Sequence, residues 1–253
     1  MIAALQAEWI KVRTVRVHWV LVIIAVAFPT VVAALVGMFN PDPQWVYSRN
    51  VIDLVSGVSV VSLLLLASLW VISLTSEYSH GTIRVTYAAV PARWKVLVSK
   101  AIVGTLVTLL VMAVTFWLAW FVGSTILNGR GASIGLGDDG VDAGGVFVSL
   151  LALAVIVSWF ALGLGAIIRN SPASVVVVLL WPLLIENLVA LALTLAGVES
   201  ASKWMPYQQA IQAVSSDDSS PDVLGRPGAQ LYFGVVALGL LLIGAVLDRR
   251  RDA

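Results

Sequence analysis

The 253-residue chain contains no cysteine and little charge: 11% of its residues are Asp, Glu, Lys or Arg, whereas 60% are hydrophobic. Without cysteine, disulfide bonds, thiolate metal sites and cysteine nucleophiles are excluded. A typical soluble domain carries about 25% charged residues, and this chain has too little polar surface to cover a water-soluble fold. Together with a mean hydropathy of +0.98, the composition indicates an integral membrane protein.

Residues for metal binding and catalysis are equally scarce. The two histidines, His18 and His80, have no cluster of acids near them, so the sequence predicts no metal site. The chain lacks a G-x-x-x-x-G-K-[ST] phosphate loop. We therefore expect no cofactor to bind directly, no catalytic residue and no nucleic-acid partner.

Six apolar runs are long enough to cross the hydrocarbon core, which takes about 20 residues as a helix. Backbone polar groups in lipid must be paired within a segment, so continuous runs of this kind are helices. The expected fold class is all-α, with six transmembrane helices making up one domain over residues 19–253. The expected spans are about 19–39, 52–75, 100–122, 146–168, 174–197 and 229–247.

Lysine and arginine divide unequally between the two sides that six spans create. The positive-inside rule places the richer side in the cytoplasm, which puts both termini there. Eleven basic residues then lie inside and four outside. The inside set is Lys11, Arg13, Arg16, Arg84, Arg93, Lys95, Lys100, Arg169 and Arg249, Arg250 and Arg251; the outside set is Arg49, Arg130, Lys203 and Arg226.

Residues 1–18 precede the first span and carry a helical apolar stripe. Its members recur every three or four residues: Ile2, Leu5, Trp9 and Val12. Glu8 and Lys11 lie off this stripe, turned away from it. The pattern predicts an amphipathic helix lying in the inner membrane interface. The alternative is a basic flank that only orients the first span.

The fifth predicted span contains a buried acid, Glu186, beside Asn187 and four residues after Pro182. An ionisable group inside a membrane is costly, and the proline frees a backbone carbonyl and favours a kink. Two interpretations stay open. Glu186 either lies in a substrate path or pairs with a base across a subunit interface, or it is a hydrogen-bonded residue that helps the helices pack.

Two segments, AEWIKVRTVRVHWV near the N-terminus and SEYSHGTIRVTYAAVPARWKVLVSK between spans two and three, resemble the permease subunits of type-2 ABC exporters, especially actinobacterial ones. The second segment contains an S-E-Y-x-x-G-T-[IL] core followed by a proline. The six-span layout and the basic tail LDRRRDA also match, so the resemblance covers essentially the whole chain.

The resemblance implies a multi-pass protein of the bacterial inner membrane that moves a hydrophobic or amphiphilic substrate (drug, peptide or lipid-like) outward. Two permease chains, identical or paralogous, would pair. Each would bind a separate ABC ATP-binding subunit, which holds ATP and magnesium, through a short coupling helix after span two.

The residues of that loop suit partner docking. Glu77 is expected to cap or to form a salt bridge, Gly81 to allow a tight turn, and Ser79 and Thr82 to cap the short helix. Apolar contact area and a charged anchor would come from Ile83, Val85, Tyr87, Val90 and Arg84, with Pro91 ending the element. Two other classes remain open: a membrane enzyme acting on lipid, and a membrane anchor or sensor that recruits a cytoplasmic partner without transport.

Overall fold

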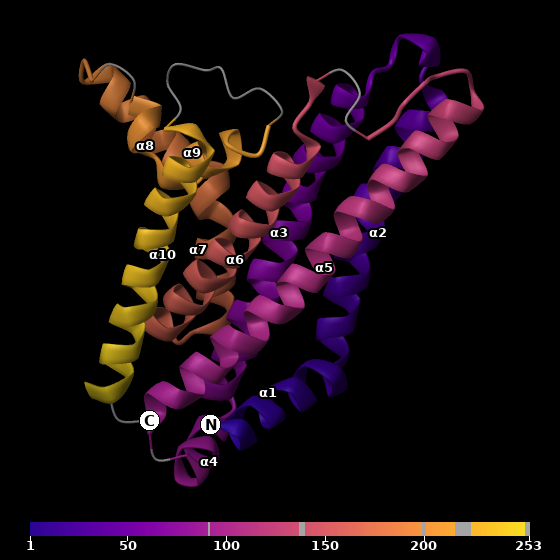
Figure 1. Cartoon of the computed structure of the whole chain (residues 1–253). Helices are drawn as coiled ribbons and strands as arrows, with labels where there is room; N and C mark the ends of the chain where they lie inside the picture. Colours follow the sequence, from indigo (N-terminus) through magenta and orange to yellow (C-terminus); the bar gives the residue numbers. More distant parts are fainter. Residues whose placement is uncertain (91, 137–139, 199–200, 216–223, 251–253) are drawn as a thin grey trace.

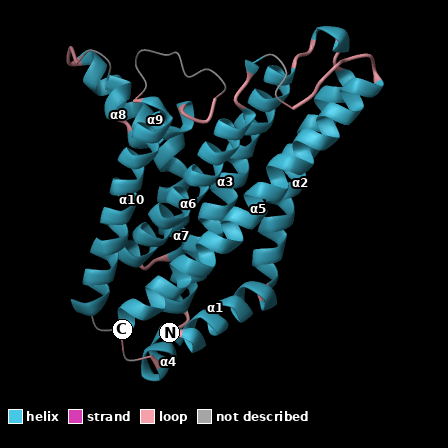
Figure 2. Cartoon of the chain, in the orientation of Figure 1, coloured by secondary structure: helices cyan, strands magenta, loops and turns pink. Residues whose placement is uncertain are grey.

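The computed structural model describes residues 1–90, 92–136, 140–198, 201–215 and 224–250. The described part of the chain is helical and contains no strand (Figure 2). The helices are α1 (Ile2–Thr14), α2 (Arg16–Phe39), α3 (Ser48–Ser79), α4 (Thr82–Ala89), α5 (Arg93–Gly129), α6 (Ala143–Ile168), α7 (Ser171–Leu180), α8 (Glu186–Leu195), α9 (Pro206–Gln212) and α10 (Gly225–Arg250), with 3-10 turns at Pro43–Trp45 and Ala201–Trp204.

Six helical segments are long and apolar enough to cross a membrane, which confirms the expected all-α, six-span fold class. They are α2, α3, α5, α6, the continuous stretch Ser171–Leu195, and α10. Two of these helices outrun the predicted spans on the side of the termini. α3 continues to Ser79 and α5 already begins at Arg93, so most of the expected loop between them is helical.

The fifth span changes its helical geometry at its proline. α7 and α8 are joined by a π-helical turn over Trp181–Ile185. Pro182, the second residue of this turn, has no N–H to donate and clashes with a regular α-helical ladder, so the wider turn accommodates it. Figure 1 shows α8 at the end of the bundle away from both termini, next to α9.

Three spans form the interior of the bundle. In the apolar parts of α3, α5 and α6, 67%, 50% and 61% of the residues are buried, against 17–22% in the other three spans. The outer spans therefore turn most of their side chains outward, as helices in lipid do. At the centre, Trp70 donates from Nε1 to Thr108 Oγ1 (2.8 Å), and Thr108 shares a hydrogen bond with Ser158 Oγ (3.1 Å). This chain of polar groups joins α3, α5 and α6.

α6 and α10 pack closely at two glycines. A Cβ atom on Gly163 would lie 2.7 Å from the backbone nitrogen of Leu241, and one on Gly244 would lie 2.7 Å from Ala166 Cβ. Only a residue without a side chain fits such a contact, which is how small residues let membrane helices pack closely. The two helices are in backbone contact at this level.

Both ends of the described chain lie at one end of the bundle, together with α1 and α4 (Figure 1). α1 is separated from α2 by a single extended residue, Val15 (φ −82°, ψ 116°), and the two helices meet at an angle. α1 packs against α5 and α2.

Candidate partner-docking site

The short helix α4 lies at the terminus end of the bundle and contains half of the residues that the sequence singled out for docking. Gly81 separates it from α3 with a left-handed backbone (φ +67°), so the tight turn expected there is present. A Cβ atom at Gly81 would meet nothing within 4 Å. Backbone conformation rather than space therefore favours glycine at this position.

α4 has a buried side and an exposed side. Ile83 is 2% exposed and points into the protein, and Tyr87 is half-buried. Arg84 and Val85 lie on the open side, and Val85 is 73% exposed. A partner at this end of the molecule would therefore meet Arg84 and Val85, whereas Ile83 attaches the helix to its own chain.

The expected side-chain caps on α4 are wrong. The first turn of this helix has no side-chain cap. Ser79 donates from Oγ to the backbone oxygen of Thr75 (3.1 Å), and Thr82 donates from Oγ1 to the backbone oxygen of Glu77 (3.4 Å). Both hydroxyls bond back to α3 because α3 runs on to Ser79, farther than the sequence suggested. Pro91 lies outside the described residues.

Glu77 belongs to a buried cluster of four charges from three helices, the Glu8–Lys11–Glu77–Lys100 cluster. Lys100 on α5 is fully buried and donates from Nζ to a carboxylate oxygen of Glu8 and to Glu77 Oε1 (2.8 Å). Lys11 donates from Nζ to Glu8 Oε1 (2.7 Å) and to Glu77 Oε1 (2.9 Å). Two carboxylates and two ammonium groups balance in charge, so the cluster links α1, α3 and α5 without a net buried charge.

The charges of this cluster shift the pKa values of its two members on α1, Glu8 and Lys11. Burial disfavours the charged form of Glu8, but Lys100 and Lys11 outweigh it and hold the Glu8 pKa below its ordinary value of 4.5. Burial likewise opposes the charge on Lys11, and Glu8 and Glu77 nevertheless raise the Lys11 pKa above 10.5. Both groups are therefore ionised at neutral pH.

The orientation of α1 corrects one expectation. Of the apolar stripe, Ile2 and Trp9 are 75% and 45% exposed, whereas Leu5 and Val12 are half-buried and pack against the hydrophobic core. Glu8, however, is 4% exposed and is turned into the protein, because Lys100 offers it a partner there. α1 is thus attached to the bundle by its charged side.

A second polar cluster, the Asp248 cluster, surrounds Asp248 near the end of α10. Tyr78 of α3 and Tyr87 of α4 each donate a hydroxyl hydrogen bond to its carboxylate, and Arg169 forms an ion pair with it (2.7 Å). Arg93 of α5 donates to the backbone oxygen of Asp248 (3.0 Å). Burial and the bond to Asp248 raise the pKa of Tyr87, so its hydroxyl stays protonated and acts as a donor.

Cation–π contacts complete the Asp248 cluster. The guanidinium of Arg93 lies 5.0 Å from the ring centroid of Tyr87, and that of Arg169 lies 4.8 Å from the ring centroid of Tyr78. Arg169 has a left-handed backbone (φ +57°) in the tight turn between α6 and α7. Through Asp248 and these contacts the short helix α4 is linked to α3, α5, α10 and the turn after α6.

Comparison with known proteins now decides the family. The model of the ABC-2 family transporter protein matches residues 4–198, most of the chain. The chain belongs to the ABC-2 transporter family. It is therefore a multi-pass membrane protein and a permease subunit of an ABC transporter. No curated protein matches the chain by sequence.

Glu186 of this ABC-2 permease lies far from α4, at the other end of the bundle. It is 2% exposed, and its carboxylate accepts hydrogen bonds from Trp181 Nε1 (2.9 Å) and from the backbone nitrogens of Tyr207 (3.0 Å) and Gln208 (2.9 Å). The last two belong to the first turn of α9, whose free N–H groups attract a carboxylate. These contacts give Glu186 a structural task, and its place in a substrate path stays a prediction.

The sequence predicts the loop between spans two and three, but it does not predict which charged residues pair with the side chains of that loop. The sequence places Lys100 and Arg169 on the cytoplasmic side without a further role and assigns no role to Asp248. The available signal is that Glu77, Lys100 and Asp248 each stand at the edge of a long apolar run, where an unpaired charge is costly. Which charges pair depends on helix packing. Among the described residues, no group of three acidic or histidine side chains is placed to hold a metal ion.

Proposed function

We propose that this ABC-2 permease is the membrane subunit of an ATP-driven exporter that moves a hydrophobic or amphiphilic substrate, such as a drug, a peptide or a lipid-like molecule, outward. ATP and magnesium bind to a separate ATP-binding subunit, and the permease contributes no catalytic residue. Two permease copies, identical or paralogous, and two ATP-binding subunits form the assembly. It lies in a bacterial inner membrane with both permease termini in the cytoplasm.

The observation that carries the proposal is the arrangement of α4. An exposed apolar residue, Val85, stands beside an exposed cation, Arg84, at the end of the molecule that also holds both termini. Arginine is enriched among the residues that dominate protein interfaces, and Val85 adds apolar contact area beside it. Glu77 is buried and supports α4 from within, whereas Ser79, Gly81 and Thr82 are exposed next to Arg84 and belong to the proposed docking surface.

The attachments of α4 supply a route for coupling. Tyr87 ties the helix to Asp248 at the end of α10, and Asp248 also holds Arg169 in the turn between α6 and α7. When the ATP-binding subunits close and displace α4, these bonds transmit the displacement to the ends of α10 and α6. A rigid element with several attachments moves its neighbours, whereas a solvated loop would absorb the motion.

The test is co-purification of the permease with the ATP-binding protein encoded next to it. The variant Arg84→Ala plus Val85→Ala removes exposed groups without disturbing either polar cluster. Its matched control, Arg49→Ala plus Leu136→Ala, removes the same kinds of side chain from the opposite end. We expect the first double variant to weaken the complex at least about tenfold and the control to leave it unchanged.

Two results would contradict the proposal. Equal retention of the ATP-binding subunit by the two double variants would remove α4 as the docking element. No association of the wild-type permease with any ATP-binding protein, while the permease stays folded, would favour the anchor or sensor function instead.

A further inference from the structure

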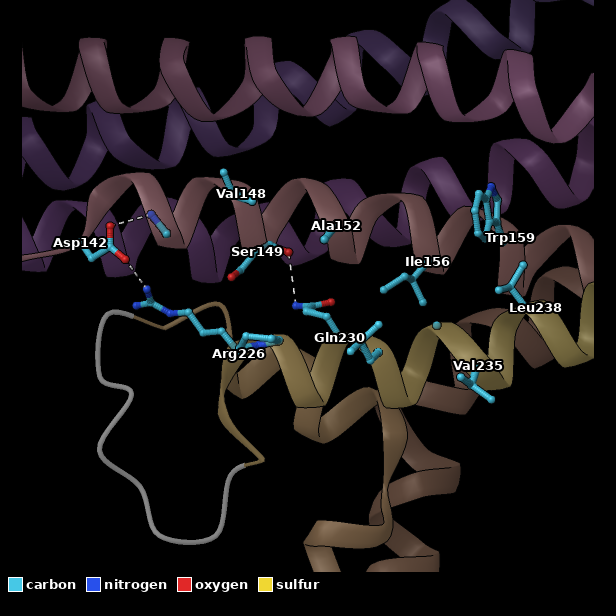
Figure 3. A pocket seen from close by; sticks show the side chains of 14 residues that line it. Asp142, Val148, Ser149, Ala152, Ile156, Trp159, Arg226, Gln230, Val235 and Leu238 are labelled. Atoms are coloured by element: carbon cyan, nitrogen blue, oxygen red, sulfur yellow. Dashed lines mark hydrogen bonds and ion pairs between the residues drawn. The ribbon is translucent and has the colours of Figure 1, made fainter.

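A groove of about 850 Å³ runs between α6 and α10 on the outer surface of the bundle (Figure 3). It lies outside the α4 region, between the close α6–α10 contact at Gly163 and the ends of these helices away from the termini. From Trp159 to Asp142 the groove follows α6 for about 25 Å at the helical rise per residue. This length exceeds half of the hydrocarbon core, which is about 30 Å thick in total.

Most of the groove is apolar and open to the surroundings. Val148 of α6 and Leu231 and Val235 of α10 are 63–70% exposed along its rims, and Ile156 lies between the helices. In a membrane this surface meets lipid rather than water. An apolar channel of this length suits an extended hydrocarbon chain.

One end of the groove is charged. Arg226 forms an ion pair with Asp142 (2.8 Å) and also donates to the backbone oxygen of Ser215 (3.2 Å). The carboxylate side chain is 66% exposed and the guanidinium side chain only 13%. A molecule entering from this end therefore meets the carboxylate first, with the positive charge more deeply placed beside it.

Gln230 marks the boundary between the charged and apolar parts, one helical turn from Arg226. It is 8% exposed, and its Nε2 donates to the backbone oxygens of Ser149 (3.3 Å) and Ala210 (3.2 Å). Its Oε1 is buried and has no partner within the described residues. This free acceptor can take a hydrogen bond from a water that accompanies a bound polar head.

We propose that the groove binds a zwitterionic, amine-bearing phospholipid from the leaflet opposite the termini. An acyl chain fills the apolar part, the phosphate lies towards Arg226, and the ammonium group lies against the exposed carboxylate of Asp142. The order of charges matches such a headgroup, in which the ammonium is farther from the chains than the phosphate. A purely anionic headgroup would bring no cation of its own to place against Asp142. This site is independent of the docking of α4 and of the direction of transport.

The first experiment blocks the groove. A Cβ atom on Gly234 would lie 3.8 Å from Ile156 Cδ1, an ordinary van der Waals contact with a side chain, so Gly234→Leu places a side chain in the groove without a backbone clash. Gly239→Leu is the matched control, because it makes the same change on the same helix where nothing lies within 4 Å. Each full-length protein is purified, placed in nanodiscs of equal phosphatidylethanolamine and phosphatidylglycerol, and extracted, and its retained lipids are counted by native mass spectrometry.

Wild type and Gly239→Leu are expected to retain phosphatidylethanolamine over phosphatidylglycerol by roughly fivefold, the discrimination expected of one exposed ion pair. Gly234→Leu is expected to retain several-fold less lipid. Equal retention in Gly234→Leu and Gly239→Leu would overturn the proposal. A homodimer that dissociates in Gly234→Leu, with retained lipid unchanged, would assign the groove to a second copy and overturn it as well.

The second experiment tests the headgroup. Asp142 accepts a hydrogen bond from the backbone nitrogen of Gly145 at the start of α6, and asparagine preserves this cap. Asp142→Asn is therefore expected to fold, to keep a bound lipid and to lose the preference, so that the two lipids are retained about equally. If Asp142→Asn keeps the wild-type preference, or wild type prefers phosphatidylglycerol, the assignment of the headgroup is wrong.

Discussion

At the scale of single residues, Lys100 is the most demanding position in the chain. Its ammonium group has no exposed surface, and two carboxylates and the Ser73 side chain surround it. Burying an ion costs several kcal/mol, which only close and complete pairing offsets. The pairing makes Glu8, on a separate helix, as necessary as Glu77.

Lys100→Met is expected to lower the free energy of unfolding by about 3–5 kcal/mol, because two buried carboxylates then share only Lys11. Lys95→Met, at a partly exposed lysine five residues earlier on the same helix, is the matched control and should cost less than about 1 kcal/mol. The measurement is the apparent melting temperature of the purified proteins in one detergent. Equal melting temperatures would show that the buried cluster contributes no stability.

The acid dependence of stability follows from the lowered pKa of Glu8. A carboxyl group with a depressed folded-state pKa stabilises the fold above its ordinary value of 4.5, and this contribution is lost as the pH falls through the folded-state pKa. The difference in melting temperature between wild type and Glu8→Gln should therefore have its largest value at pH 6 and become smaller as the pH falls below 4.5. A constant Glu8→Gln difference down to pH 3 would contradict the prediction.

At the scale of helices, close packing decides which spans stay together. α6 contacts α10 through Gly163 and Gly244, and the same helices separate farther along to form the lipid groove. The central spans are held by hydrogen bonds instead, through Trp70, Thr108 and Ser158. Glycine contacts and polar contacts thus fix different helix pairs.

Gly163→Ala should push α6 and α10 apart, because its Cβ atom would lie within 2.8 Å of the backbone of Leu240 and Leu241. Overpacking of this kind costs about 1–3 kcal/mol. Gly239→Ala, which has open space, is the control and should be neutral or slightly stabilising. The apparent melting temperatures compare the two, and a Gly163→Ala protein as stable as its control would show that the contact yields easily.

At the scale of the whole molecule, two polar clusters connect the ends of the spans at the end of the bundle where both termini lie. The Glu8–Lys11–Glu77–Lys100 cluster holds α1, α3 and α5, and the Asp248 cluster holds α3, α4, α5, α10 and the turn after α6. Through the Asp248 cluster, α4 is therefore linked to the ends of α3, α5, α6 and α10.

The lack of cysteine makes the orientation of the whole molecule directly testable. Val85→Cys and Leu136→Cys each introduce one exposed thiol, at opposite ends of the bundle. If the termini are cytoplasmic, a membrane-impermeant maleimide should label Leu136→Cys in intact cells and Val85→Cys only after the cells are opened. The reverse pattern would invert the proposed topology.

The sequence predicted the fold class because span formation is local. About twenty apolar residues in succession need a helix to pair their backbone groups, wherever the helices then go. The tight turn at Gly81 was also visible, because left-handed backbone favours glycine. The caps on α4 were predicted wrongly, since Ser79 and Thr82 lie within or beside a longer α3.

What the sequence by itself determined is therefore the number of spans, the helical class and the position of a basic segment between spans two and three. The tertiary structure decided which charges meet. Glu8 and Lys100 are 92 residues apart, and Tyr78 and Asp248 are 170 apart. No local pattern encodes such pairs, because their attraction depends on distances that exist only after the helices have packed.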